Sequence, residues 1–423
     1  MASNNTADDT PFPWEVGVFD AHCHPTDTMT SIAAIPHMKA STLTIMATRG
    51  EDQHLVEQVA SQLGRKRREQ QKENSSQPDG QIDSTERVIP CFGWHPWFAH
   101  HIHDDLSPTT SSTSSSSSSS KIAHYRNVLT GSSAHDDAFF LALPDPKPLS
   151  TLLAETRTRL LAHPTALVGE VGLDKTFRVP NVWKPEEIQA RDGSLTPGAR
   201  EGRTLSIYRV TMNHQKALLK AQLQLAGELR RAVSIHSVHA HGAVLELLQE
   251  LWRGHERKVP SRRERRRRRS AELAHEESDE EKRERNKIDG NDRKTEQDED
   301  QHETQEDSGP LPFPPRICMH SYSGPAEPLK QFLHPSVPSD IYFSFSTVIN
   351  FPSSSNRSVD KVVEVIKALP DDRILIESDI HCAGQQMDDL LEEVARTVCQ
   401  LRGWTLAKGV KQLAENWRRF VFG

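Results

Sequence analysis

The stretch "VGVFDAHCH" (residues 16–24) joins a short apolar run to two histidines that stand one residue apart. The apolar part, residues 16–20, predicts a buried β-strand. Side chains at positions i and i+2 of an extended chain project to the same side, so His22 and His24 can reach one ion. A single histidine at a strand end is more often a hydrogen-bonded structural residue than a ligand. Whether the two histidines bind an ion therefore depends on which side chains stand at the ends of the other strands.

Seven further apolar runs predict strands at residues 43–48, 88–94, 166–172, 232–237, 316–321, 341–348 and 373–379. Helical patterns stand among them and after the last of them, at residues 148–162, 208–231, 242–253, 359–369, 387–401 and 407–420. Apolar strands that alternate with helices indicate a parallel sheet covered by helices, and eight such units match an α/β fold of the (β/α)8 TIM-barrel type. A doubly wound open sheet is the competing fold, but its GxGxxG fingerprint is missing after the first strand.

Three polar segments interrupt this pattern. Residues 65–86 are charged and almost free of apolar side chains, and residues 104–120 contain an unbroken serine tract. Residues 253–310 open with an arginine block and then turn acidic. Such segments bury too little apolar surface to offset the entropy of ordering them. The sequence predicts one barrel domain, residues 14–423, with these three segments as disordered loop insertions.

Composition and charge exclude several classes of protein. The net charge of -7 does not indicate a protein that binds nucleic acids or membranes through its overall charge. No signal peptide or run of about 18 apolar residues occurs, and the five cysteines lack paired spacing. We expect a cytoplasmic or nuclear protein with reduced thiols. The arginine block (262–269) reads as a nuclear localisation signal, a phosphate-binding arm or a solvated linker. The adjacent acidic run would compete for DNA, which favours the linker and the localisation signal.

Ligand-type side chains stand at the ends of five predicted strands. They are His22, His24, Glu170, His236, His320 and Asp379. The C-terminal ends of barrel strands open on one face, where this fold builds its active sites. Four imidazoles and two carboxylates suit Zn²⁺ or Mn²⁺ better than Ca²⁺, and six ligands are more than one catalytic ion takes while it keeps an open position. The sequence predicts two divalent ions, with Glu170 on the middle strand as their bridge.

Six short motifs, in this order, resemble one known family. They are "FDAHCH" (19–24), "GWHP" (93–96), "GEVGLD" (169–174), "SIHS" (234–237), "MHSYSG" (319–324) and "IESD" (376–379). Together they resemble the TatD-type deoxyribonucleases of the metal-dependent hydrolase superfamily, and the closing "LAENWRRFVF" (413–422) is similar to the last helix of that family. The resemblance covers nearly all of the chain outside the three insertions.

The resemblance implies a role for each of these residues. It implies a first ion held by His22, His24 and Asp379, a second held by His236 and His320, and Glu170 between them. Asp379 would also orient or deprotonate the attacking water, which makes Asp379 and Glu170 the catalytic pair. His95 would contact the substrate phosphate. The alternative for His95 is a structural histidine fixed beside Trp94 and Trp97. The ions implied are two of Mg²⁺, Mn²⁺ or Zn²⁺.

Departures from the family pattern fall on the substrate side. Lys175 follows "GLD" where an aromatic residue is usual, Val238 stands in place of an arginine, and Ile380 and His381 replace the usual proline. The leading hypothesis is a two-metal hydrolase that cleaves DNA phosphodiester bonds with a metal-activated water. An amidohydrolase-like enzyme acting on a non-nucleic substrate and a metal-binding barrel that serves as a protein-interaction scaffold are the alternatives.

The pattern of long insertions is similar to a fungal branch of the family. Members of that branch are described as partners of a TPR-repeat subunit of the anaphase-promoting complex. The resemblance therefore implies a TPR-containing protein partner besides DNA. The lack of a long apolar run predicts no membrane partner. No stretch of the sequence shows a TPR-binding motif. The sequence does not indicate the oligomeric state either.

Overall fold

The computed structural model describes residues 10–64, 86–107, 118–131, 136–189, 191–259, 263, 309–352 and 356–423. The disorder predicted for the insertions falls largely on residues 65–85, 108–117 and 260–308, which, apart from Arg263, lie outside the described residues. Ser118–Ser120, the last residues of the second predicted insertion, form the first turn of a helix.

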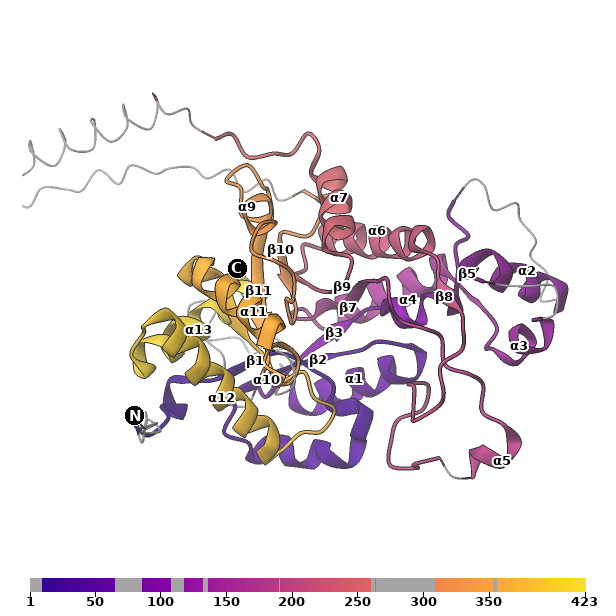
Figure 1. The fold of residues 1–423 in the computed structure, drawn as a ribbon, viewed down its shortest axis with the longest axis horizontal. Coiled ribbons are helices and arrows are strands. Elements are labelled where there is room, and N and C mark those ends of the chain that lie inside the picture. The colour runs from indigo at the N-terminus through magenta and orange to yellow at the C-terminus, as the bar shows by residue number, and fades with distance from the viewer. Residues whose placement is uncertain are drawn as a thin grey trace, which may run out of the picture.

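Eight parallel strands form the central sheet, and helices surround it (Figure 1). In sheet order they are β1 (Phe19–Cys23), β2 (Thr42–Met46), β3 (Val88–Phe92), β7 (Leu167–Asp174), β9 (Val233–Val238), β10 (Arg316–Met319), β11 (Asp340–Phe345) and β12 (Ile374–Ile376). Every neighbouring pair runs parallel. Spatial order equals chain order, as in a barrel built from successive βα units. The predicted (β/α)8 fold is confirmed.

Hydrogen bonds bring the two edges of the sheet together. The Asp379 N–H donates to His22 O (3.0 Å), and the His24 N–H donates to Ile380 O (2.9 Å). Beside them, the buried Asp20 carboxylate accepts hydrogen bonds from the backbone N–H and the hydroxyl of Ser378. These contacts place the chain that follows β12 directly against β1, so the first and last motifs of the sequence meet in space.

The larger helices of the described chain are α1 (Gly50–Leu63), α2 (Ser118–Val128), α4 (Leu149–Ala162), α6 (Met212–Glu228), α7 (His241–Trp252), α11 (Asn356–Ala368), α12 (Gln385–Arg402) and α13 (Leu406–Phe422). Shorter ones are η1 (Trp14–Val16), η2 (Pro25–His37), η3 (Pro96–His101), α3 (Asp137–Ala142), α5 (Pro185–Ile188), α9 (Leu329–Phe332), α10 (Thr347–Asn350) and η4 (Asp371–Arg373). Two small sheets pair β4 (Ile102–His103) with β6 (Lys147–Pro148) and β5 (Leu129–Thr130) with β8 (Arg209–Val210). None of the helices in the described ranges is long and apolar enough to cross a membrane.

Two predicted element boundaries were wrong for local reasons. The first strand begins at Phe19 rather than residue 16, because Gly17 has φ +95° and the residues before it form η1. His22 therefore lies within β1 instead of following it. The helix predicted from residue 208 begins at Met212, because the residues before it pair with β5 as strand β8.

Apolar side chains fill the barrel in two sets that alternate along the strands. On β2, Met46 belongs to the cluster that includes Phe19, whereas Ile45 packs in the larger cluster that also includes residues of the surrounding helices. Helix α13 covers the first cluster: the Trp417 ring stacks on Phe19 at a centroid distance of 4.4 Å, and its Nε1–H donates to Thr44 Oγ1 (3.0 Å). The last helix is thus anchored to the first two strands.

Trp417→Ala should destabilise the fold strongly. Its side chain is 1% exposed, so truncation leaves a large cavity and an unpaired Thr44 hydroxyl. We expect the free energy of unfolding to fall by about 3–5 kcal/mol, measured by chemical denaturation. Trp183→Ala, at a partly exposed tryptophan, is the matched control. A loss below about 1 kcal/mol in Trp417→Ala would show that this ring does not anchor α13 to the first strands.

Candidate metal centre

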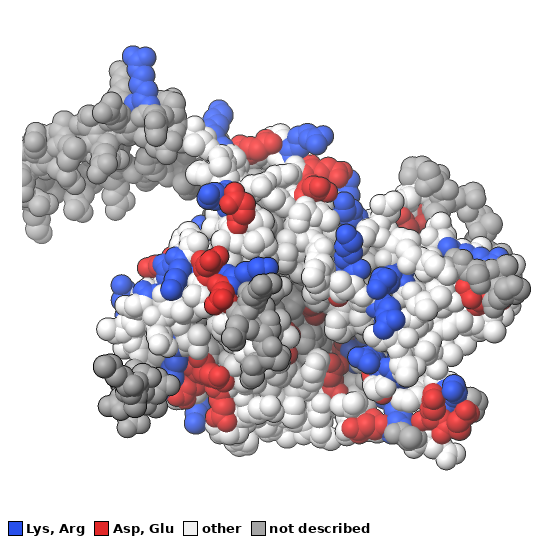
Figure 2. Space-filling model, in the orientation of Figure 1, with Lys and Arg blue, Asp and Glu red and all other residues white. Residues whose placement is uncertain are grey.

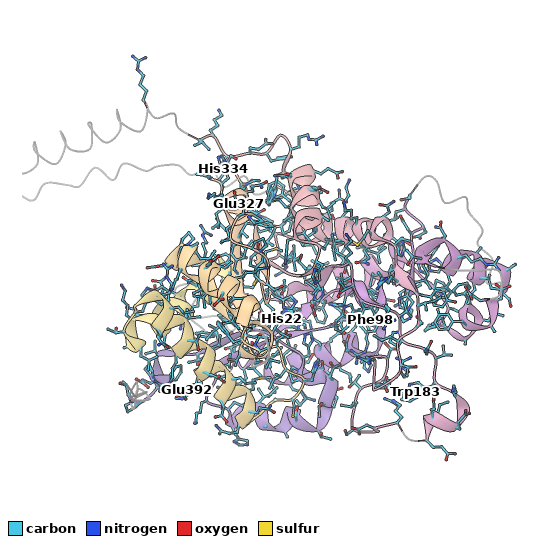
Figure 3. The ribbon with its side chains drawn as sticks, in the orientation of Figure 1. His22, Phe98, Trp183, Glu327, His334 and Glu392 are labelled. Atoms are coloured by element: carbon cyan, nitrogen blue, oxygen red, sulfur yellow. The ribbon has the colours of Figure 1, made fainter. Side chains whose placement is uncertain are left out.

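The structure brings the six predicted ligand residues together at the C-terminal ends of the strands. His22 lies in β1, Glu170 in β7 and His236 in β9. The other three follow strands: His24 after β1, His320 after β10 and Asp379 after β12. Asp379 stands three residues beyond its strand, not at the end of it as expected. Five of the six are buried, Asp379 is partly exposed, and His22 lies near the middle of the molecule (Figure 3).

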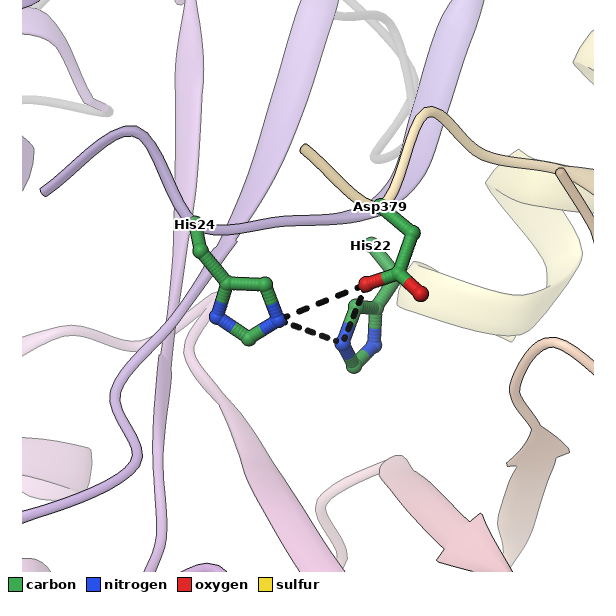
Figure 4. A group of neighbouring side chains, drawn as sticks. All are labelled: His22, His24 and Asp379. Carbon is green, nitrogen blue, oxygen red and sulfur yellow. Dashed lines mark hydrogen bonds and ion pairs between the residues drawn. The ribbon is translucent and has the colours of Figure 1, made fainter. Parts of the chain in front are cut away.

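One side of the cluster gathers around Glu170 Oε2. This oxygen lies 3.5 Å from both His22 Nε2 and His24 Nε2. Those two nitrogens are 3.1 Å apart, and Asp379 Oδ1 lies 3.5 Å from His24 Nε2 and 3.9 Å from His22 Nε2. The side chains of His22, His24 and Asp379 point toward one another, the histidines from the β1 edge of the sheet and Asp379 from the β12 edge (Figure 4). Two imidazole nitrogens and two carboxylate oxygens thus converge on one small space.

The other side gathers around Glu170 Oε1. This oxygen lies 2.8 Å from His320 Nε2, 2.9 Å from His236 Nδ1 and 3.0 Å from His95 Nε2. His236 Nδ1 and His320 Nε2 are 3.3 Å apart. The two oxygens of one carboxylate therefore face two different sets of nitrogens.

Three histidines have an oxygen beside the nitrogen that faces away from Glu170. His22 Nδ1 lies 2.9 Å from Ser234 Oγ, His236 Nε2 lies 3.3 Å from Asp174 Oδ2, and His320 Nδ1 lies 3.6 Å from Glu377 Oε1. At His22 and His236 that oxygen can accept a hydrogen bond from the ring N–H, which leaves the lone pair of the other nitrogen for an ion. At His320 the separation of 3.6 Å is too long for a hydrogen bond. The Nδ1 of His320 and the Oε2 of Glu377 are buried without a hydrogen-bond partner among the described residues.

His95 has the opposite arrangement. The Trp97 backbone N–H donates to His95 Nδ1 (3.2 Å), so this nitrogen carries the lone pair and the ring proton is on Nε2. Burial lowers the pKa of His95 to about 4, in keeping with a neutral ring. His95, Glu170 and His236 have ligand atoms within 4.8 Å of one another. The hydrogen bond nevertheless leaves His95 Nε2 as the protonated nitrogen, 3.0 Å from Glu170 Oε1.

The carboxylates remain ionised although they are buried. Burial would raise the pKa of Glu170, but the surrounding histidines, led by His95, hold it well below its usual range. For Asp379, burial is likewise opposed, by the hydrogen bond with His24 and by charge on the neighbouring histidines, and the pKa falls to about 2. The hydrogen bond with Asp379 and the charge of Glu170 outweigh burial and raise the pKa of His24 to about 9, so a divalent ion of the zinc or manganese type would displace a proton there.

The rim beside His24 holds a network that the sequence did not reveal. The Asp27 carboxylate accepts hydrogen bonds from buried Arg49 Nη2 and from exposed His381 Nδ1, both at 2.7 Å. The His381 ring lies 5.5 Å from that of His24, centroid to centroid. His381, one of the positions where the chain departs from the family pattern, is thus tied to this network through Asp27.

Sequence reasoning also missed the outer partners Ser234, Asp174 and Glu377. A signal for two of them was present, since Ser234 precedes His236 by two residues and Glu377 precedes Asp379 by two. Alternation along β9 places Ser234 and His236 on the same side, whereas Glu377 and Asp379 lie beyond the end of β12. Asp174 ends the motif "GEVGLD". Only the fold shows that it lies against β9.

Comparisons with known proteins agree with these motifs. Residues 19–422 match the model of the family described as TatD related DNase. The chain is 31% identical over 404 residues to Cut9-interacting protein scn1 of Schizosaccharomyces pombe, which covers 96% of this chain and 98% of that protein. It is 23% identical over 354 residues to the uncharacterized deoxyribonuclease YMR262W of Saccharomyces cerevisiae, which covers 81% of this chain and 84% of that one.

Among solved structures, the chain is similar to YJJV, a TatD homologue from Escherichia coli K12, with a TM-score of 0.46 and 16% identity. The similarity covers 94% of this chain and 95% of that one. The family match extends from β1, with the first two histidines, to the end of α13. The chain belongs to the TatD-related DNase family of hydrolases.

Proposed function

We propose that this protein is a two-metal deoxyribonuclease that hydrolyses phosphodiester bonds. The main observation behind the proposal is that the two carboxylate oxygens of Glu170 face separate sets of imidazole nitrogens. A carboxylate between two ions is the usual core of two-metal hydrolases. Membership of the family supports hydrolysis, and the name of the Saccharomyces cerevisiae relative supports DNA as substrate.

The residues divide into two ligand sets. His22, His24 and Asp379 would hold one ion, His236 and His320 the other, and Glu170 would bridge them. When bound, two ions of the Mg²⁺, Mn²⁺ or Zn²⁺ type would neutralise phosphoryl charge and lower the pKa of a water molecule. Acidic and basic side chains are interspersed on the face seen in Figure 2, without one continuous basic surface. Charge neutralisation is therefore expected at the metal centre rather than over this surface.

The side chains around the ions supply proton transfer and orientation. The Asp379 carboxylate is partly exposed and ionised, so it can accept the proton of the attacking water and orient that water toward phosphorus. His95 Nε2–H, which donates to Glu170 Oε1 in this structure, would donate to a non-bridging phosphate oxygen once substrate is present. Its backbone partner at Nδ1 holds the ring in the required tautomer.

His95→Ala should slow hydrolysis without loss of metal. Removing one donor to the phosphate is expected to lower kcat/KM about 10²- to 10³-fold. His95→Gln, whose amide can place an N–H near the same point, should recover part of that activity. Metal content after dialysis should equal that of the unaltered protein in both variants. Loss of one metal equivalent in His95→Ala would instead make His95 a ligand.

Degradation of end-labelled single-stranded DNA by the purified chain in Mn²⁺ or Mg²⁺ tests the proposal. We expect cleavage that stops when a chelator removes the ions. A chain that binds two ions and leaves DNA intact would overturn it. An amidohydrolase-like reaction on a non-nucleic substrate would then be the better proposal, although carbonyl-cleaving relatives often bridge their ions with a carboxylated lysine rather than a glutamate.

The similarity to Cut9-interacting protein scn1 supports a second candidate function, the binding of a protein partner. We propose a TPR-containing protein of a cell-cycle complex as that partner, in the cytoplasm or the nucleus. Binding of the purified chain to such a protein, with and without ions, tests the idea. A scaffold should bind equally well when the metal centre is disabled by Glu170→Gln, and failure of both forms to bind would refute it.

A further inference from the structure

An aromatic pair stands beside the metal centre. The rings of Trp97 and Phe177 stack at a centroid distance of 4.6 Å with an interplanar angle of 9°. The Trp97 ring lies 4.7 Å from the ring of His95 and 5.9 Å from that of His236. Trp97 is nevertheless 37% exposed, and Phe177 is partly exposed. A large apolar pair is thus left open to solvent next to the ligand residues.

Asp174 fixes this pair in place. Its Oδ2 accepts the Trp97 Nε1–H (2.7 Å) and lies 3.3 Å from His236 Nε2. Its Oδ1 accepts hydrogen bonds from the backbone N–H groups of Thr176 (2.7 Å) and Phe177 (2.9 Å). One carboxylate therefore holds both aromatic residues and a predicted metal ligand. The pair is preorganised relative to the metal centre rather than free to rotate away.

Cationic side chains flank the pair. Lys175 and Arg178 stand on either side of the segment that carries Phe177, and both are exposed. The exposed Arg209 lies against the same turn, since its Nε donates to Thr176 O (3.4 Å). None of the three forms an ion pair with another residue that the structure describes, so their charges remain available to an anionic polymer.

We propose that Trp97 and Phe177 form a stacking platform for a nucleobase whose own phosphate lies at the metal centre. The inference rests on the proposed nuclease function and adds to it a subsite for the base of the bound nucleotide. Base and phosphate of one nucleotide are joined through a single sugar, so a phosphate at the ions places its base near the adjoining aromatic ring. A paired base is already stacked within its duplex, whereas an unpaired base offers its π-face to the platform. The flanking cations would contact neighbouring phosphates.

Phe177→Leu tests the platform, because it keeps an apolar side chain and leaves the Trp97–Asp174 hydrogen bond in place. We would measure the Kd and kcat/KM of a short single-stranded oligonucleotide, and of one with abasic sugars at every position. For the base-bearing strand, we expect Phe177→Leu to weaken binding about 5- to 150-fold, since stacking of one base contributes about 1–3 kcal/mol. For the abasic strand, variant and unaltered protein should match. Phe177→Tyr should restore affinity.

Trp183→Ala is the matched control, because this partly exposed tryptophan contacts Arg203 and lies far from His22 (Figure 3). Equal losses on both strands, or no loss on either, would overturn the platform while leaving the nuclease standing. Base-dependent binding without cleavage would overturn the nuclease and keep the platform. Failure of the unaltered chain to bind or cleave either strand would overturn both.

Discussion

Glu170→Gln should abolish metal-dependent hydrolysis while the barrel still folds. Glutamine is nearly isosteric with glutamate, but its amide presents one carbonyl oxygen and one N–H₂ group, and the latter repels a cation. Because Glu170 Oε1 and Oε2 face different histidine sets, one set must lose its bridging oxygen. We expect turnover to fall on the order of 10³-fold or more, and bound metal to fall below two equivalents per chain. Steady-state kinetics and elemental analysis measure the two quantities.

The same substitution at an exposed site provides the control. Glu327 is exposed and lies away from His22 (Figure 3), so Glu327→Gln should leave both activity and metal content unchanged. Circular dichroism of Glu170→Gln should report a folded barrel. Retained turnover in this variant would exclude the bridging role and would leave at most one catalytic ion. A loss of turnover accompanied by unfolding would show only that the substitution disrupts the fold.

The barrel could be predicted, and the six proposed ligand residues could be placed at one end of it, because both depend on local patterns. The strands are apolar runs of about the length that parallel strands require, and the ligand residues lie in them or within three residues of their C-terminal ends. Even so, the predicted first strand was three residues out of place. The apolar run that includes Val16 and Val18 contains Gly17, whose positive φ ends η1 before β1 can begin. A glycine in an apolar run is a weak signal until its conformation is known.

Long-range contacts account for most of what sequence reasoning missed. A third apolar cluster, apart from the two in the barrel, joins Trp94 in the "GWHP" motif to Tyr125 on α2, Phe140 on α3 and Val210 on β8. These residues come from segments with little periodicity, beside a serine tract and a loop. Their burial arises from packing against each other, and no pattern within any one segment encodes it. The tautomer of His95 likewise depends on a backbone N–H supplied by η3, which the sequence alone could not orient.

Asp379→Asn should remove turnover and keep the ions. Asp379 has φ +54°, a left-handed conformation that asparagine adopts more readily than most residues, so the backbone after β12 should not be strained. The amide oxygen can still face His24 Nε2, where Oδ1 now lies at 3.5 Å, but an amide cannot accept the proton of a water molecule. We expect kcat to fall about 10²- to 10⁴-fold with nearly unchanged metal content.

Comparing Glu170→Gln with Asp379→Asn separates the bridging of the ions from the transfer of the proton. If Glu170 bridges and Asp379 acts as the base, Glu170→Gln loses metal and activity together, whereas Asp379→Asn loses activity alone. Asp389→Asn, at an exposed position of α12, should behave as the unaltered protein. Loss of one metal equivalent in Asp379→Asn would make this carboxylate chiefly a ligand and would leave proton transfer to another group. Undiminished kcat with full metal content would exclude Asp379 from the reaction, and a water held by the ions alone would then suffice for attack.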